Sequence, residues 1–584
     1  MRPASARDAD MPTPDTACAG PRHPAGYHPP MAMSPESRER WLFWLVALLM
    51  LGTGLGLRDP WPADEPRFAL VARQMVESGQ WLFPTRGDEL YSDKPPLFMW
   101  LQAVAMSATG SLRVGFLLPS LLASLGTLWL VRDLGERLFS RQAGAYAGWA
   151  LLVAVQFTFQ ARRAQIDPVL LSFTTLAVYG LLRHVLRGPD WRMWSLGWFA
   201  AGLGVISKGV GVVALLVLVP AGFAIVRGWM GAGGMHWRDA RAWLGPAALL
   251  LPVLAWLLPM LLTVRGSGDP ALQAYADDIL LRQTAKRYAD PWHHHQPAWY
   301  FLEVIATQWL PTSLALLWAW RPWRDALRAR DARVLVLLGG AALIVLFFSL
   351  SAGKREVYIL PALPLLCVAL GPVLASILQR PAARRTALGF AALLAGLLTA
   401  AGAAVLLGEP GFERRLAEAR GLAGNADAVG AVLLAIGAAG LACCAAFGLR
   451  RAEAALVGTL ASLWLAVGLV GAPMLNDASS ARGLMQRVAA RLRAQDELAL
   501  VAWKEQLLLM ADRPARTFGF KREVSLQRAD AIAWQRERPA SRWLLLEDTA
   551  LVPCIDRRLA FHMGRSNRRG WWLVPARAVD CPAP

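Results

Sequence analysis

The chain has 584 residues, of which 55% are hydrophobic and 18% are charged, and its mean hydropathy is +0.36. Soluble domains are about one-quarter charged, so this composition excludes an ordinary soluble globular protein. The formal net charge of +19 does not indicate a nucleic-acid partner, because the arginines lie between apolar runs and membrane topology explains them better. The six cysteines form no CxxC pattern and exclude a disulfide-rich scaffold.

Long apolar runs predict a polytopic α-helical membrane protein. Val210–Val226 and Ala242–Val264 contain no charged residue. A helix of ~20 apolar residues crosses the ~30 Å hydrocarbon core and satisfies its own backbone hydrogen bonds. About thirteen runs meet this requirement. They are Trp41–Leu57, Val114–Val131, Ala143–Gln160, Val169–Val185, Trp194–Ile206, Val210–Val226, Trp243–Val264, Phe301–Trp320, Val334–Ser351, Tyr358–Leu378, Leu388–Leu407, Val429–Phe447 and Ala455–Met474.

Arginine clusters predict the orientation, because cytoplasmic loops are enriched in Lys and Arg. The clusters occupy every second loop, so we expect the intervening loops, among them 58–113 and 265–300, to lie outside with the tail after Met474. The apolar stretch Leu97–Ala108 would reverse this parity, and we therefore expect it to be a helix on the membrane surface. The clusters are Arg38/Arg40, Arg132/Arg137/Arg141, Arg183/Arg187/Arg192, Arg227/Arg238/Arg241, Arg321/Arg324/Arg328/Arg330/Arg333, Arg380/Arg384/Arg385 and Arg450/Arg451.

We expect three parts in the chain. Residues 1–40 are rich in Pro, Ala and charge without an apolar period, which is typical of a disordered segment, here cytoplasmic. Residues 41–475 form the membrane domain, and residues 476–584 form a small periplasmic α/β domain in which strand-like runs alternate with helical patterns. Cys554 and Cys581 lie in the last part, as a disulfide or as two free thiols. The strand-like runs are Leu498–Trp503, Trp543–Glu547 and Trp571–Val574.

Ionisable residues gather at the predicted outer face. A lone lysine there is usually a membrane anchor, and neighbours such as Asp93 and Lys94 are usually a solvated surface pair. Together, however, these residues supply what chemistry on a lipid phosphate needs, because carboxylates hold or deprotonate an acceptor and cations neutralise a leaving phosphate. The candidates are Asp64, Glu65, Arg67, Lys94, Asp167, Lys208, Lys354 and Tyr358.

Five short motifs carry a family resemblance. Residues 63–69 read A-D-E-P-R-F-A, residues 91–100 read Y-S-D-K-P-P-L-F-M-W, and residues 162–168 read R-R-A-Q-I-D-P. Residues 204–209 read G-V-I-S-K-G, and residues 354–361 read K-R-E-V-Y-I-L-P. In order, they resemble the motifs D-E-x-R-[YF]-A, Y-x-x-K-P-P-L-x-x-W, A-R-x-x-x-x-D, L-x-K-G (with isoleucine for leucine here) and K-x-x-x-Y-x-L-P. These motifs belong to polyprenyl-phosphate-dependent membrane glycosyltransferases, the family of lipid A aminoarabinose transferases and protein O-mannosyltransferases.

The resemblance implies a GT-C fold and a sugar transferase that works with inversion at the anomeric carbon. The donor is then a sugar on undecaprenyl phosphate, and the reaction takes place at the periplasmic face of a bacterial inner membrane. By the same resemblance, Asp64 is the catalytic acidic residue with Glu65 beside it, and Asp167 orients the site or Arg67. The residues implied in binding the donor phosphate are Lys94, Arg67, Lys208, Lys354 and Tyr358.

The acceptor decides what Asp64 does, and the sequence leaves this open. A hydroxyl acceptor requires a general base, whereas a lipid A phosphate is already anionic and needs only to be positioned. We expect 4-amino-4-deoxy-L-arabinose or a similar sugar to be transferred to lipid A, and another cell-surface glycan or a protein is the alternative acceptor. A transporter of lipid-linked substrates is less favoured, because it would carry ionisable residues at mid-bilayer and internal repeats.

Adjacent histidines suggest a separate hypothesis, a structural metal. His293 and His295, with Asp93 from the first outer loop, offer imidazole and carboxylate ligands that suit zinc. Successive side chains point apart, so three neighbouring histidines cannot all face one ion, and ordinary interfacial histidines are the alternative. We expect the chemistry itself to require no cofactor.

Overall fold

The computed structural model describes residues 34–281, 295–351, 353–408 and 426–582. The chain divides into two compact units, Met1–Phe43 and Trp44–Pro584. In the first unit, the described residues form the beginning of helix α1 (Pro35–Gly52), where the Ser34 hydroxyl accepts a hydrogen bond from the Ser37 amide at 3.2 Å. All other elements belong to the second unit.

Seven helical segments of the described residues are long and apolar enough to cross a membrane. The fold is therefore that of a polytopic helical membrane protein, as the apolar runs predict, while the total of thirteen crossings stays a prediction. The seven segments are Leu112–Leu138, Ile166–Arg187, Ala240–Ser267, Ala332–Ser349, Pro381–Leu406, Ala426–Phe447 and Leu449–Ser479, and shorter apolar helices cover Leu97–Thr109, Gly211–Val226 and Ala362–Leu378.

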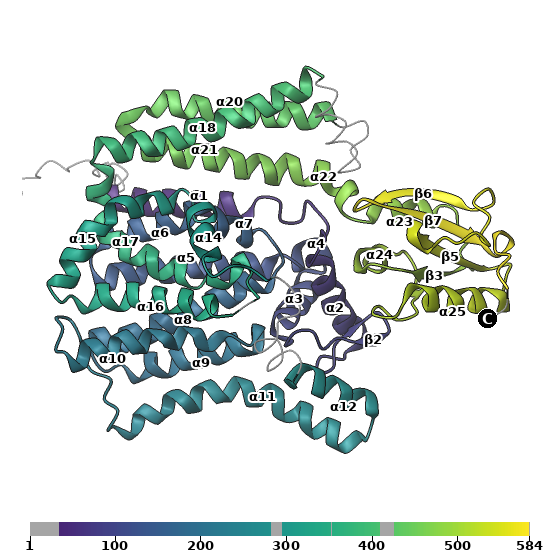
Figure 1. The fold of residues 1–584 in the computed structure, drawn as a ribbon, viewed down its shortest axis with the longest axis horizontal. Helices are drawn as coiled ribbons and strands as arrows, with labels where there is room; N and C mark the ends of the chain where they lie inside the picture. The colour runs from purple at the N-terminus through teal and green to yellow at the C-terminus, as the bar shows by residue number, and fades with distance from the viewer. Residues whose placement is uncertain (1–33, 282–294, 352, 409–425, 583–584) are drawn as a thin grey trace, which may run out of the picture. The chain divides into compact units, whose positions relative to one another are not determined.

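The helices of the membrane part follow one another along the chain, many of them with fewer than six intervening residues (Figure 1). Their bounds are α4 (Leu112–Gly115), α5 (Leu118–Leu138), α6 (Arg141–Val153), α7 (Val155–Ala161), α8 (Ile166–Arg187), α9 (Trp191–Lys208), α10 (Leu218–Val226), α11 (Leu244–Ser267), α12 (Pro270–Asp277), α14 (Tyr300–Gln308), α15 (Leu316–Arg328), α16 (Ala332–Ser349), α17 (Ala362–Leu378), α18 (Pro381–Leu406), α20 (Ala426–Phe447), α21 (Ala452–Ala466) and α22 (Ala472–Ser479).

Some apolar runs are not single helices. The run Ala143–Gln160 is divided between α6 and α7, which meet at the extended residue Ala154. The run Phe301–Trp320 is divided between α14 and α15, with Pro311 between them. Proline lacks the amide that a continuing helix needs, so the second interruption has a local cause. Hydropathy thus predicts the apolar runs but not their internal breaks.

Close backbone contact holds α8 against α9. A Cβ atom at Gly180 of α8 would lie 2.4 Å from the Met193 carbonyl, and one at Gly197 of α9 would lie 2.9 Å from the Ala177 carbonyl. Small residues let membrane helices approach this closely. The ends of these two helices therefore have fixed positions relative to each other. On another side of the membrane part, α18, α20 and α21 lie side by side (Figure 1).

Between α1 and α4, the chain forms two helices and a short hairpin. Helix α2 (Glu65–Ser78) has Pro66 in its first turn and ends at Gly79, whose φ of +72° is left-handed. Strands β1 (Thr85–Arg86) and β2 (Glu89–Leu90) pair antiparallel. Helix α3 (Leu97–Thr109) follows Pro95 and Pro96, and it is the short helix that the sequence predicts there. The Phe68 and Phe98 rings pack edge to face at 5.4 Å and join α2 to α3.

The C-terminal segment forms a five-stranded mixed sheet in the order β4-β3-β5-β7-β6. Strand β3 is parallel to β4 and β5, whereas β7 is antiparallel to β5 and β6. The three strand-like runs of the sequence fall in β3, β5 and β7, and the structure joins Cys554 to Cys581 by a disulfide. The elements are α23 (Arg482–Ala489), β3 (Glu497–Val501), α24 (Glu505–Met510), β4 (Ala515–Arg516), α25 (Val524–Glu537), β5 (Arg542–Glu547), β6 (Phe561–Ser566) and β7 (Arg569–Pro575).

Alternation along the strands gives this sheet two apolar faces. On β3, Ala499 and Val501 join the core that includes Ile532 of α25. Leu498 and Leu500 point the other way and join a core that includes Phe68 of α2. Successive strand residues face opposite sides of a sheet, so a single strand serves both cores. The second core attaches the C-terminal sheet to the segment that begins at α2.

Candidate functional site

Two carboxylate–cation pairs lie at helix ends, and one turn connects them. The Arg67 guanidinium donates a hydrogen bond to the Asp64 carboxylate at 2.5 Å. The Lys208 ammonium donates one to the Asp167 carboxylate at 2.5 Å. The Gln165 side-chain amide, two residues before Asp167, donates to the other Asp64 oxygen at 3.2 Å. Four of the predicted site residues are therefore brought into one connected group.

Helix geometry explains why the charges meet here. Asp167 lies in the first turn of α8 and Lys208 in the last turn of α9, so each charge is stabilised by the dipole of its own helix. Helix α9 ends at Gly209, whose φ of +85° is left-handed and favours glycine. Asp64 precedes α2, but its side chain does not cap that helix, which leaves both carboxylate oxygens for Arg67 and Gln165.

The four charged side chains are only partly covered. The exposed fractions are 21% for Asp64, 25% for Arg67, 11% for Asp167 and 13% for Lys208. These groups are accessible to a substrate yet shielded enough to interact strongly with it. The Lys208 ammonium also lies 5.4 Å from the centre of the Tyr358 ring, a cation–π contact. Tyr358 is thus a fifth predicted residue in this group.

Glu65 differs from its neighbour Asp64. It is 1% exposed, and its carboxylate accepts hydrogen bonds from Arg58 at 2.5 and 2.7 Å. It also accepts hydrogen bonds from the backbone amides of Trp61 at 2.8 Å and Ala164 at 3.0 Å. A carboxylate held by four donors has little capacity left for a substrate. Glu65 therefore holds the start of α2 against the turn before α8, and the catalytic role expected for it stays a prediction.

Two buried polar atoms in the region of Arg67 have no hydrogen-bond partner in the described part of the chain. They are Arg67 Nε and the hydroxyl of Tyr91, which is 1% exposed. Burial raises the pKa of Tyr91 well above its ordinary value, and the nearby Arg67 only partly offsets this, so the hydroxyl keeps its proton. An ordered water or a ligand oxygen would satisfy these two groups.

Lys94 and Lys354 lie in different surroundings. Lys94 is partly exposed in the turn that precedes α3. Lys354 is 4% exposed and donates to the backbone carbonyl of Gln296 at 3.0 Å. The adjacent Gly353 pairs with His295 as an isolated antiparallel bridge. Lys354 therefore holds two segments together, and its role in binding the donor phosphate stays a prediction.

The zinc hypothesis finds no support among the described residues. Asp93 accepts a hydrogen bond from Lys521 at 3.0 Å and lies 3.5 Å from an Arg86 nitrogen. Burial alone would raise the pKa of Asp93, but Lys521 and Arg86 outweigh it and lower that pKa, so the carboxylate is ionised and its charge is already matched. His293 lies outside the described residues. Within those residues, no group of three or more His, Cys, Asp or Glu side chains is arranged to hold a metal.

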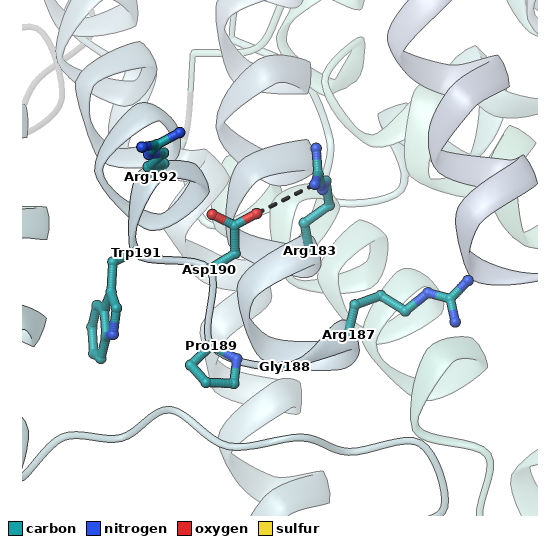
Figure 2. A pocket seen from close by; sticks show the side chains of 7 residues that line it. All are labelled: Arg183, Arg187, Gly188, Pro189, Asp190, Trp191 and Arg192. Atoms are coloured by element: carbon teal, nitrogen blue, oxygen red, sulfur yellow. Dashed lines mark hydrogen bonds and ion pairs between the residues drawn. The ribbon is translucent and has the colours of Figure 1, made fainter.

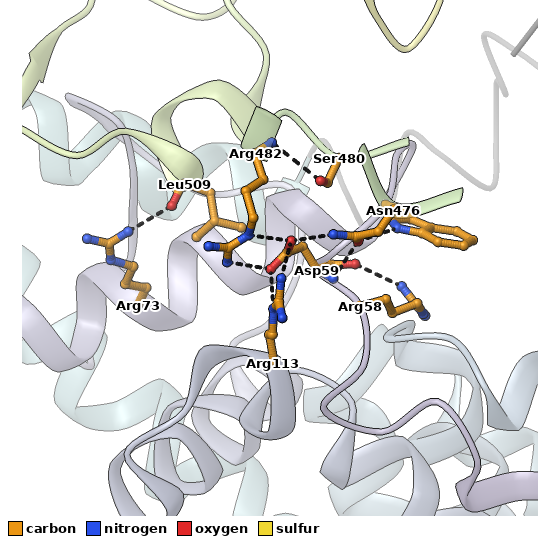
Figure 3. A network of polar contacts seen from close by, with 9 residues as sticks. Arg58, Asp59, Arg73, Arg113, Asn476, Ser480, Arg482 and Leu509 are labelled. Atoms are coloured by element: carbon orange, nitrogen blue, oxygen red, sulfur yellow. Dashed lines mark hydrogen bonds and ion pairs between the residues drawn. The ribbon is translucent and has the colours of Figure 1, made fainter. Parts of the chain in front are cut away.

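A buried carboxylate that the sequence analysis missed joins the segment between α1 and α4 to the C-terminal segment. Asp59 is 0% exposed and accepts hydrogen bonds from Arg113 at 2.8 Å and Arg482 at 2.6 Å (Figure 3). The Asn476 side-chain amide donates to it at 2.7 Å, and the Asp59 backbone amide donates back to Asn476 at 2.8 Å. Burial would raise the pKa of Asp59, but Arg482, Arg113 and Asn476 hold it far below its ordinary value.

Further contacts of the same kind surround this junction. The Thr517 hydroxyl contacts the Asp88 carboxylate at 2.5 Å. The Arg73 guanidinium donates to the Leu509 carbonyl at 2.8 Å, also visible in Figure 3. The Arg86 guanidinium lies over the Phe520 ring at 3.8 Å. With Asp59, these contacts fix the C-terminal segment to the chain between residues 58 and 113, which includes the Asp64–Arg67 pair.

Comparison with known proteins identifies the fold. The structure of ArnT from Cupriavidus metallidurans bound to undecaprenyl phosphate superposes with a TM-score of 0.71 at 22% identity, over 93% of this chain and 99% of that one. The same protein in the apo state gives a TM-score of 0.70. The chain therefore has the GT-C fold of a membrane glycosyltransferase, as the motifs predict.

Sequence comparisons agree with the fold. A family model described as dolichyl-phosphate-mannose-protein mannosyltransferase matches residues 93–259. Undecaprenyl phosphate-α-4-amino-4-deoxy-L-arabinose arabinosyl transferase 2 of Sodalis glossinidius is 29% identical over 55% of this chain and 56% of the relative. The protein of the same name from Pseudomonas fluorescens is 28% identical over 62% and 63%. The alignments thus span less than two-thirds of these relatives. These partial similarities agree with the resemblance to polyprenyl-phosphate-dependent membrane glycosyltransferases that the motifs indicate.

The contacts of Asp59 with Arg113 and Arg482 lead to a first testable prediction. Replacing Asp59 with asparagine removes the charge that Arg113 and Arg482 share, and hydrogen bonds to a charged group contribute about 1.5–3 kcal/mol each. We expect a lower midpoint of thermal unfolding in detergent and faster proteolytic release of the C-terminal segment. The control is Asp512→Asn, because Asp512 is exposed and pairs with the adjacent Arg513. Equal behaviour of the two variants would contradict the role of Asp59.

The lowered pKa of Asp59 makes a second prediction. Because the folded-state pKa is depressed, the ionised carboxylate stabilises the fold fully above the ordinary pKa of about 3.9, and this stabilisation is lost as the pH falls through the folded-state value. Unfolding midpoints measured from pH 7 to pH 3 should show a gap between wild type and Asp59→Asn that is constant near neutrality and narrows below about pH 4. A gap that widens on acidification would refute the pKa direction.

Proposed function

We propose that this chain transfers a sugar from undecaprenyl phosphate to an acceptor at the periplasmic face of the bacterial inner membrane. The sugar is 4-amino-4-deoxy-L-arabinose and the acceptor is lipid A. The names of the relatives from Sodalis glossinidius and Pseudomonas fluorescens support this choice of donor. The ArnT structure from Cupriavidus metallidurans, which has undecaprenyl phosphate bound, supports the same lipid carrier.

The observation that carries the proposal is the connected group at the start of α8. A carboxylate paired with Arg67 and a carboxylate paired with Lys208 lie on either side of Gln165. Chemistry on a lipid-linked sugar requires one group to direct the acceptor and cations to stabilise the leaving phosphate. This arrangement supplies both within hydrogen-bonding reach of a single turn.

The roles follow from these contacts. The acceptor oxygen attacks the anomeric carbon as the bond from that carbon to the phosphate oxygen breaks, and the electron pair leaves with undecaprenyl phosphate. Lys208, Arg67 and Lys94 stabilise that phosphate, and Tyr358 orients the Lys208 ammonium. Asp64 directs the acceptor: it positions a lipid A phosphate, or it takes the proton from a hydroxyl. Asp167 orients Lys208, to which it is hydrogen-bonded.

We propose the following topology for this activity. About thirteen helices cross the membrane, and the arginine-rich loops lie in the cytoplasm. Residues 1–40 form a cytoplasmic segment, residues 41–475 the catalytic membrane domain and residues 476–584 a periplasmic α/β domain. Support comes from the seven long apolar segments of the described chain and from the alternating arginine clusters.

A second acceptor is favoured by one observation. The family model described as a protein mannosyltransferase matches residues 93–259, which contain Lys94, Asp167 and Lys208. The same donor site can serve a protein or glycan hydroxyl, and in that case Asp64 acts as general base. Charged pairs at helix ends, rather than at mid-bilayer, disfavour a transporter of lipid-linked substrates.

Asp64 and its neighbour Glu65 provide a matched pair of variants that tests the site. Asp64→Asn should leave expression, membrane insertion and thermal stability unchanged but lower the transfer rate by about 10²–10⁴-fold, the range for loss of a general base or equivalent group. Glu65→Gln should instead lower the thermal stability, because it weakens the buried pair with Arg58. Transfer is measured as sugar incorporated into lipid A by membranes containing each variant. Normal transfer by Asp64→Asn would eliminate this site.

Acceptor and sugar are tested together in cells. Lipid A from cells with and without the gene is compared by mass spectrometry under conditions that induce envelope modification. We expect a mass increase equal to an aminopentose only when the gene is present. An unchanged lipid A spectrum, with sugar appearing on another glycan or on a protein, would favour the second acceptor.

A further inference from the structure

A polar cavity lies at the end of α8 that is remote from the candidate site. Its volume is about 580 Å³, and it surrounds the Gly188–Pro189 turn between α8 and α9 (Figure 2). Helix α8 begins at Ile166, beside Asp167, and its 22 residues rise by about 33 Å. That length matches the ~30 Å hydrocarbon core. The cavity and the candidate site therefore face opposite sides of the membrane.

Positive charge dominates this cavity. Arg183, Arg187 and Arg192 line it together with one acid, Asp190. Asp190 is engaged with Arg183 at 3.3 Å and with the Met193 amide at 3.1 Å. The pairing of Arg183 with Asp190 is visible in Figure 2, where Arg187 and Arg192 extend away from that pair. The described residues of the cavity lining therefore hold no second carboxylate to pair with Arg187 and Arg192.

The partners of these two arginines do not neutralise them. Arg187 donates to the backbone carbonyl of Arg137, which bears no net charge. Arg192 is exposed, and none of the ion pairs in the described part of the chain includes it. A nearby acid, Asp133, already accepts hydrogen bonds from Arg137 at 2.5 Å and from the Tyr179 hydroxyl at 2.6 Å. The cavity therefore offers guanidinium groups whose charge an anion can match.

Aromatic rings beside the cavity indicate its level in the membrane. Trp191 lines it and packs against the His184 ring at 4.7 Å. Buried Trp194 lies 4.9 Å from the same His184 ring, and its indole donates to the Ala242 carbonyl at 3.0 Å. Tryptophan is enriched where membrane helices meet the headgroup layer. An amphiphile lying in the bilayer would therefore present its headgroup at this level.

We propose that the α8–α9 cavity binds a phosphate-bearing anion, namely the headgroup of an anionic phospholipid. Guanidinium groups bind phosphate oxygens through paired hydrogen bonds, and basic pockets between membrane helices take anionic headgroups. The volume lies within the ~300–1,000 Å³ of small-ligand sites. The positive-inside rule explains why this loop carries positive charge. It does not explain why the arginines surround a cavity. The proposal does not depend on the transferase reaction.

The test uses the full-length protein in detergent and a pair of matched double variants. Arg187→Gln/Arg192→Gln removes the two excess charges and leaves the Arg183–Asp190 pair intact. Arg450→Gln/Arg451→Gln removes two exposed arginines from a loop predicted to lie at the same face. Phosphatidylglycerol, phosphatidylcholine and inorganic phosphate are each titrated, and bound molecules are counted by native mass spectrometry.

We expect phosphatidylglycerol to bind wild type and the Arg450/Arg451 variant alike. Binding to the Arg187/Arg192 variant should weaken by about fivefold for each arginine removed, which corresponds to ~1 kcal/mol per basic residue near the headgroups. Inorganic phosphate that binds in place of the lipid, with the same dependence on Arg187 and Arg192, would assign the site to a soluble phosphate. Equal weakening in both double variants, or equal binding of phosphatidylcholine, would overturn the proposal.

Discussion

A carboxylate withdrawn from water requires compensating charge, and Asp59 obtains it from two distant parts of the chain. Arg113 comes from α4, whereas Arg482 and Asn476 come from the start of the C-terminal segment. The C-terminal segment thus supplies two of the three side chains that hydrogen-bond to the Asp59 carboxylate. Arg58, next to Asp59, then holds Glu65 at the start of α2. The position of the candidate site thus depends on a contact made outside it.

Two kinds of charge can be distinguished in this region by burial. Asp59 and Glu65 are fully buried and hold donors from several segments, which makes them structural. Asp64 and Lys208 retain some exposure and have one or two partners each, which is what reacting groups need. Adjacent residues in one motif, Asp64 and Glu65, therefore have different roles. The buried charges fix the backbone, and the partly exposed ones are free to change partners when a substrate enters.

Several residues that the sequence predicts for the site lie close together in the structure where they belong to local motifs. Asp64 and Arg67 are three residues apart on one helix start, and Asp167 and Lys208 lie at helix ends that short loops bring together. These relations depend on local geometry, which sequence patterns carry. The GT-C fold was predicted from the same motifs, and the C-terminal strands from short apolar runs that alternate with helical patterns.

Other features depend on contacts that no local pattern encodes. Asp59 and Arg482 are separated by 423 positions, so nothing in the sequence around either residue indicates the pair. The burial that distinguishes Glu65 from Asp64 becomes visible only in the fold. The partner of Asp93, Lys521, lies in the distant C-terminal segment. The sequence near Asp93 therefore did not show that its charge is already matched. At the break after Ala154, the Val155 amide donates to the distant Leu310 carbonyl at 2.9 Å, a contact that hydropathy does not register.

The central claim is that this chain breaks the bond between a sugar and undecaprenyl phosphate and passes the sugar to an acceptor. The most direct measurement combines purified full-length protein with undecaprenyl phosphate-linked 4-amino-4-deoxy-L-arabinose and lipid A in detergent, and follows both lipids by mass spectrometry. We predict that one undecaprenyl phosphate is released for each aminopentose that lipid A gains. A donor that stays intact in the presence of lipid A, with protein that is folded and binds undecaprenyl phosphate, would contradict the account.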